Sequence, residues 1–138
     1  MSIARRLVLS GLALMTALAL AAPAFAQGGG QAQVRVAHLA PDAPNVDVYV
    51  NGDPVLTDVA YTTVSGYLSL PAGTQQVTVY ATGDTTSPVI DTPVELAAGG
   101  AYTVAAVGLV ADESLTAQVY EDDLRDPASG NAKVRVVH

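Results

Sequence analysis

The amino-acid sequence predicts an all-β fold, a single antiparallel β-sandwich of immunoglobulin-like or related topology with about seven to eight short strands. Three observations lead to this prediction. Apolar residues alternate with polar ones at period two in several segments, turn-forming residues separate these segments at short intervals, and no segment beyond the leader has a capped helical pattern of substantial length.

The N-terminus has the pattern of a cleaved signal peptide. Arg5 and Arg6 form a short basic start, residues 7–22 are almost uninterruptedly apolar, and small residues precede a cleavage site after Ala26. The apolar run is short for a bilayer span, so removal of residues 1–26 is favoured over a retained membrane anchor. We therefore expect the mature protein to be secreted, periplasmic or attached to the cell surface, without insertion into a membrane.

The mature part is strongly acidic and contains no cysteine. Because the leader holds two basic residues and no acidic one, its removal changes the net charge from -7 to about -9. Such a surface repels nucleic acids and anionic lipid headgroups, so neither is a predicted partner. Without disulfides, stability must come from apolar burial, a metal or association with neighbours, and about 110 residues suffice for burial alone.

After a predicted flexible spacer at residues 27–32, the sandwich domain is predicted over residues 33–130. Valines alternate with polar residues in 34–36, 46–50 and 77–79, as expected for half-buried strands. Turn-forming residues separate these runs, in the segments Asn51-Gly52-Asp53-Pro54, Pro71-Ala72-Gly73, Gly83-Asp84 and Ala98-Gly99-Gly100.

Residues 101–110 are nearly all apolar and rich in β-branched side chains. This pattern is typical of a central strand that is covered on both faces, although periodicity alone leaves a buried helix open. The flanking residues favour the strand, because Gly99 and Gly100 precede the run and Asp112 follows it.

One internal repeat is present. The sequence AQVRVAH at residues 32–38 returns as AKVRVVH at residues 132–138. Residues 131–138 are therefore predicted to be the start of a second repeat of the domain or the closing strand of the first. Residues 34–38 and 134–138 are also candidates for edge strands that pair within the domain or with a neighbouring module through main-chain hydrogen bonds.

Two segments carry a resemblance to a known family. Residues 34–52, VRVAHLAPDAPNVDVYVNG, closely resemble the opening signature of the domain-of-unknown-function family 4397, and YLSLPAG at 67–73 with VTVY at 77–80 is similar to its second characteristic region. The resemblance implies a secreted or surface-attached β-sandwich module that is frequently present in tandem, with no established activity or ligand.

The loop after the first strand holds the most unusual cluster of polar residues. A metal or polar-ligand site would use His38, Asp42 and Asp47, since imidazole and carboxylates are common ligands on stiff loops. The favoured interpretation is structural: Asp42 accepts backbone N–H bonds within the turn, and His38 ties the strand end to it. The residues of this candidate structural motif are Pro41, Asp42, Pro44, Asp47, Asn51 and Gly52.

The acidic segment 121–126 has carboxylates that would suit calcium, but it lacks the alternating spacing of a calcium loop. It is predicted to be a solvated linker, with at most one helical turn between Asp122 and Asp126.

No motif of a known catalytic class is present, and the sequence predicts neither an enzyme nor a cofactor. The chain has no tryptophan, and its one phenylalanine, Phe25, lies in the leader, which leaves tyrosine as the aromatic side chain of the mature domain. Tyr49 and Tyr80 fall opposite the valine face of their strands and form a candidate interaction face, although tyrosines packed singly over the sheet are the more common arrangement.

These observations predict a non-catalytic exported module with a structural, adhesive or surface-interaction role. Its expected partners are other surface or matrix proteins or tandem copies of itself. The alternative is an extracytoplasmic module that binds a small ligand or a metal.

Overall fold

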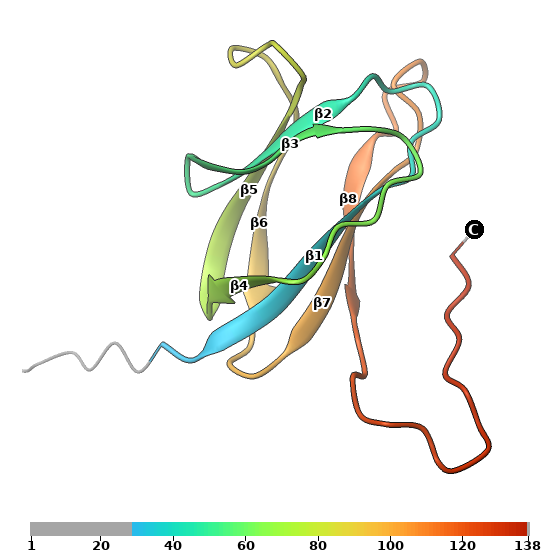
Figure 1. Cartoon of the computed structure of the whole chain (residues 1–138). Helices are drawn as coiled ribbons and strands as arrows, with labels where there is room; N and C mark the ends of the chain where they lie inside the picture. The colour runs from blue at the N-terminus through green and yellow to red at the C-terminus, as the bar shows by residue number, and fades with distance from the viewer. Residues whose placement is uncertain (1–28, 138) are drawn as a thin grey trace, which may run out of the picture.

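Eight strands form two four-stranded sheets in the computed structural model, which describes residues 29–137 (Figure 1). Sheet A has the order β4-β1-β7-β8 and consists of β1 (Gln31–His38), β4 (Leu68–Pro71), β7 (Ala101–Val107) and β8 (Thr116–Glu121). Sheet B has the order β3-β2-β5-β6 and consists of β2 (Val46–Val50), β3 (Asp53–Val59), β5 (Gly73–Ala81) and β6 (Pro88–Leu96). The predicted β-sandwich is confirmed. The predicted signal peptide and cleavage site lie outside the described residues.

Sheet A is mixed rather than antiparallel throughout. β1 runs parallel to β7, with Gln33 opposite Ala101 and His38 opposite Ala106, whereas the other strand pairs are antiparallel. A parallel pair needs a long connection, and all of sheet B together with β4 lies between these two strands in the chain.

β1 begins at Gln31, two residues before the predicted start of the domain at residue 33. Ala32 is fully buried, and the Gln31 carbonyl oxygen accepts a hydrogen bond from the Gly99 N–H at 2.8 Å. Backbone pairing begins already at Gly30, whose carbonyl oxygen accepts the Ala72 N–H at 2.8 Å, and a composition rich in Gly and Gln does not reveal this.

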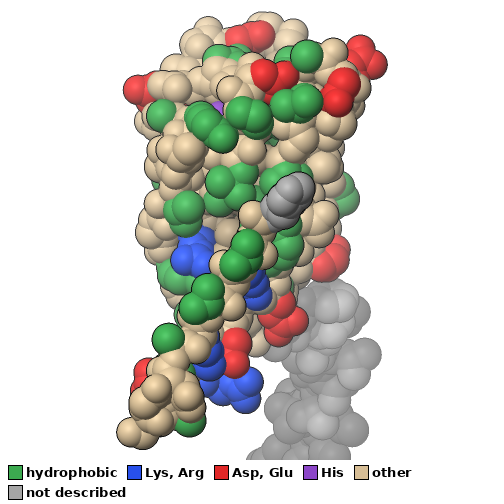
Figure 2. Space-filling model, turned by 90° about the vertical axis from the view of Figure 1, so that its right-hand side faces the viewer, with side chains coloured by type: hydrophobic (Ala, Val, Ile, Leu, Met, Phe, Trp, Pro, Cys, Tyr) green, Lys and Arg blue, Asp and Glu red, His purple; other side chains and the backbone are tan. Residues whose placement is uncertain are grey.

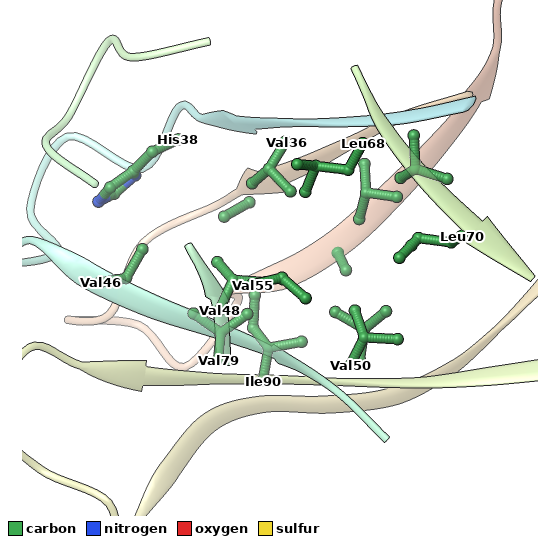
Figure 3. Close-up of a pocket in the computed structure, with 15 residues that line it drawn as sticks. Val36, His38, Val46, Val48, Val50, Val55, Leu68, Leu70, Val79 and Ile90 are labelled. Carbon is green, nitrogen blue, oxygen red and sulfur yellow. The ribbon is translucent and has the colours of Figure 1, made fainter. Parts of the chain in front are cut away.

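Valine dominates the core between the sheets. β2 alternates strictly, with Val46, Val48 and Val50 buried and the two intervening side chains half-buried. A cavity of about 30 Å³ remains between the sheets, lined by apolar side chains and by His38 at one end (Figure 3). Such a volume holds about one water molecule, so this core has no room for an organic ligand.

β7 is the central strand that the sequence predicts, and it is covered on both faces. Val104 points into the core, while Thr103 and Ala105, on the opposite face, are only 8% and 1% exposed. Their burial requires cover from outside the sandwich, and this cover comes from side chains of β1 and from the C-terminal part of the chain.

The residues after β8 form neither helix nor strand within the described range, so the turn of helix considered for 122–126 does not occur. Residues 132–137 run extended over the outer face of sheet A (Figures 1 and 2). Residues 34–38 pair within the domain, one of the two arrangements considered, but they are not an exposed edge: β7 lies on one side, and Val34 pairs with β4 and Ala37 with Val64 on the other. The edges of sheet A are β4 and β8. Residues 29–137 include no helix long and apolar enough to cross a membrane.

Candidate functional site

His38, at the end of β1, is fully buried and holds the following loop in place. Its Nε2 lies 3.0 Å from the Pro44 carbonyl oxygen and donates to it, which leaves Nδ1 to accept the Ala40 N–H at 3.4 Å. The ring of Tyr61 meets the imidazole edge-on, with the ring centroids 6.2 Å apart. Both ring nitrogens therefore bond to the loop backbone.

Asp42 joins this loop to the turn after β7. Its two carboxylate oxygens accept the N–H groups of Val110 and Ala111, each at 2.9 Å. The bonds from Ala111 and Val110 lower the pKa of Asp42 below its usual value, because they stabilise the charged form. The sequence placed the acceptor correctly, but its partners lie in a distant turn and not in its own.

Asp47 and Asn51 fix two turns of sheet B in a similar way. Asp47 Oδ1 accepts the Asp58 N–H at 2.8 Å, which is the main cause of its lowered pKa, and the Thr82 hydroxyl at 3.0 Å. Asn51 has φ of 51° and is followed by Gly52 at 88°, a pair suited to a tight hairpin turn. Pro41 and Pro44 lie in the loop between β1 and β2.

The structure does not bring His38, Asp42 and Asp47 together as metal ligands. Among residues 29–137, no three His, Cys, Asp or Glu side chains form a group that could hold a metal ion, and this includes the acidic segment 121–126. Each candidate ligand instead bonds to a different part of the backbone.

Tyr49 and Tyr80 contact each other edge-to-face on the outer face of sheet B, with ring centroids 5.3 Å apart. Around them, Gln76 and Thr78 both donate to Asp91 across β5 and β6. The two tyrosines thus form a small aromatic pair within a polar face whose side chains already bond to one another.

The polar cluster with the most contacts surrounds Asp122, which sequence analysis assigned to a solvated linker. Its side chain is only 6% exposed, directly after β8. Its Oδ2 accepts the Tyr67 hydroxyl at 2.8 Å and the Thr103 hydroxyl at 2.5 Å, with Arg35 Nε 3.5 Å away. Its Oδ1 accepts a hydrogen bond from Arg135. Burial raises the pKa of Asp122, but the hydroxyl bonds and the two arginines outweigh burial and lower it overall.

The strand register explains why these residues meet. Arg35 lies opposite Thr103 in the β1–β7 pair, and Thr103 lies opposite Tyr120 in the β7–β8 pair. Side chains that are opposite one another in register share one face of the sheet. Arg35, Thr103 and Tyr120 therefore form a row on the outer face of sheet A, next to Asp122.

The two arginines of the internal repeat have matching environments. The Arg35 guanidinium lies 5.0 Å above the Tyr67 ring, and the Arg135 guanidinium lies 5.6 Å above the Tyr120 ring. Arg135 also donates to the Glu121 carbonyl oxygen. The repeated VRV sequence indicated that the two arginines correspond to each other. Nothing in the acidic segment 121–126 indicated that Asp122 would contact both of them.

A shallow groove continues from this cluster along the outer face of sheet A, and we call it the outer groove. Its volume is about 170 Å³, and Arg135 and Val137 of the C-terminal segment form part of its wall, with Val137 38% exposed. Figure 2 shows this face, with the C-terminal segment running across it. The groove is lined by Arg35, Ala37, Leu39, Val64, Thr103, Ala105, Tyr120, Arg135 and Val137.

Two packed four-stranded sheets make this protein an all-β sandwich domain. Residues 32–138 match the family described as domain of unknown function (DUF4397), and the chain belongs to that family. No curated protein matches the sequence.

Proposed function

We propose that this protein is a non-catalytic exported module that binds other polypeptide chains with the outer face of sheet A. One observation carries the proposal: residues 132–137 of its own chain already lie extended on that face, with Arg135 bonded to Asp122 and Val137 beside the apolar residues that line the outer groove. A surface that holds an extended segment by a charged anchor and an apolar contact has the properties of a peptide-binding face.

The exposed apolar side chains of this face support the same role. Val134 and Val136 are 83% and 87% exposed, and Val64, beside the outer groove, is 51% exposed. Exposed apolar residues that gather on one face commonly mark a protein interface. The net charge of about -9 without the leader disfavours nucleic acid or an anionic membrane as the partner.

Export is proposed on the signal-peptide pattern of residues 1–26 and has its own test. The mature protein recovered outside the cytoplasm is expected to begin at Gln27, which the intact mass of the purified protein measures. A mass that includes residues 1–26 would contradict the predicted cleavage.

The interaction role is tested by photo-cross-linking in the cells that export the protein. A photoreactive amino acid replaces Val136, which is exposed on the docked segment, residues 132–137. In a matched control it replaces Thr57, an exposed residue of β3 in sheet B. We expect cross-links to polypeptide from position 136 and few from position 57. Equal yields from both positions, or none from position 136, would contradict the proposed binding face.

A further inference from the structure

We propose that the partner bound by the outer face of sheet A is a second copy of this chain, which places its own residues 132–137 on this face. The proposal rests on the interaction role proposed above and specifies the partner. The recognised feature is an arginine followed two residues later by a valine, on an extended backbone.

Three groups of the domain contact the Arg135 guanidinium. The Arg135 guanidinium donates to Asp122 Oδ1 and to the Glu121 carbonyl oxygen, and it lies over the Tyr120 ring at 5.6 Å. Oδ2 of the same carboxylate accepts two hydroxyl bonds, from Tyr67 and Thr103. These bonds hold the carboxylate so that Oδ1 faces the incoming guanidinium, which favours a planar, forked donor over an ammonium group.

Side chains of residues 132–137 point alternately toward the domain and away from it. Lys133, Arg135 and Val137 contact the domain: Lys133 lies 2.9 Å from Asp123, and Val137 lines the outer groove. Val134 and Val136 point away and are exposed. An extended chain places every second side chain on one face, so Lys133, Arg135 and Val137 contact the domain together.

The docked segment is attached differently from the strand that it repeats. In β1 the VRV sequence is part of the sheet, and its two valines, Val34 and Val36, are only 4% and 9% exposed. In residues 132–137 the same sequence has no strand partner, and the chain between Asp123 and Lys133 is without helix or strand. Residues 132–137 can therefore leave the surface without unfolding a sheet, whereas β1 cannot.

Competition with the chain's own segment determines when a second copy binds. A short linker holds the docked segment of each chain, its native segment, at an effective concentration of about millimolar near its own domain. In dilute solution each chain therefore binds its own segment. Exchange between copies is expected where copies are concentrated or joined in series, or where the native segment lacks its arginine.

The experiment uses the mature full-length chain with Arg135→Ala, which removes the anchor of the native segment. A fluorescent peptide of residues 131–138, NAKVRVVH, is titrated with this variant and with the wild-type chain, and binding is followed by fluorescence anisotropy. We expect saturable binding to the variant and weaker binding to the wild type, because the native segment of the wild type competes for the groove.

Two matched peptides test the recognised features without altering the fold of the protein. A peptide with Arg135→Gln is expected to bind at least about tenfold more weakly, since it loses the charged bonds to Asp122 and Glu121. A peptide with Val137→Asp is expected to bind more weakly as well, because it places a charge in the outer groove.

Equal binding of the Arg and Gln peptides, or equal binding to the variant and the wild type, would overturn the proposal. An unrelated arginine-containing peptide that binds as tightly would also overturn it, by showing a general guanidinium site. If NAKVRVVH fails to bind while cross-links form at position 136, the partner is a different polypeptide and the interaction role stands. If the peptide binds but no cross-links form in cells, the interaction role fails and the specificity of the groove remains.

Discussion

Arg35 and Arg135, which occupy the same position of the repeated VRV sequence, approach the two oxygens of a single carboxylate, that of Asp122. Arg35 Nε lies 3.5 Å from Oδ2, and Arg135 donates to Oδ1. A carboxylate that is only 6% exposed and receives two hydroxyl bonds in addition becomes the link between β1, β8 and the C-terminal segment. Removing one partner of such a network leaves the others without their bonds.

Asp122→Ala is expected to lower the free energy of unfolding by about 2 kcal/mol, because the buried donors around it lose their acceptor. Urea unfolding followed by circular dichroism measures this change. Asp123→Ala is the matched control: its side chain is 43% exposed, so a clearly smaller loss than that of Asp122→Ala is expected. Equal losses in the two variants would contradict the role assigned to Asp122.

Acid is expected to destabilise the protein through the same carboxylate. The pKa of Asp122 is lowered from 3.8 in the folded state, so its stabilising contribution is present above about pH 4 and is lost as the pH falls through the folded value. Asp42 and Asp47, whose pKa values are also lowered, act in the same direction. The urea midpoint should therefore fall between pH 7 and pH 3, and it should fall less in Asp122→Asn. An equal fall in both proteins would be inconsistent with this assignment.

Asp42→Ala is expected to loosen the turn after β7 while leaving the sheets intact. The N–H groups of Val110 and Ala111 lose their acceptor, so their exchange with deuterium should become faster, and that of Val104 in β7 should not change. Amide exchange followed by NMR measures this directly. Unchanged exchange at both turn residues would show that Asp42 does not hold the loop to the turn.

Calcium, zinc and chelators are expected to leave the melting temperature unchanged. A metal that binds the folded state must raise the midpoint, but His38, Asp42 and Asp47 each bond to separate backbone groups and do not converge. Thermal unfolding with each ion and with a chelator tests this. A rise that disappears in Asp42→Ala would restore the metal-binding interpretation.

The small cavity between the sheets offers a way to stabilise the fold. Val48→Ile adds one methylene next to a void of about 30 Å³ and is expected to raise the free energy of unfolding by up to about 0.8 kcal/mol. Val134→Ile, at a position that is 83% exposed, is the control and should have no effect. A loss of stability in Val48→Ile would mean that the void cannot accept the side chain without strain.

Local patterns were sufficient to predict the strands with strong alternation or continuous burial. The period-two valines of β2 and the apolar run of β7 form strands as predicted, because consecutive residues show which side chains will be buried. β4 was not predicted: it is four residues long and ends in proline, so its pairing with β1 depends on a distant partner and not on its own composition.

The candidate site, too, was predictable only in part. The loop from His38 to Asp47 was recognised as a structural motif from its prolines, histidine and carboxylates, yet the partners of Asp42 lie after β7 and were not predictable from neighbouring residues. Asp122 was misassigned because an acidic run after a strand usually remains in solvent. Its burial depends on Tyr67, just before β4, on Thr103 in β7 and on Arg35 in β1, which are far apart in the sequence.

The all-β class, the valine core and the repetition of VRV can be recognised from the amino-acid sequence, because alternation, turn residues and internal similarity are properties of short stretches of chain. The parallel pairing of β1 with β7, the internal place of β1 in sheet A and the meeting of both arginines at Asp122 become visible in the folded domain alone. These features depend on which strands become neighbours and in what register, and strand pairing is settled by packing over the whole domain and not by any single segment.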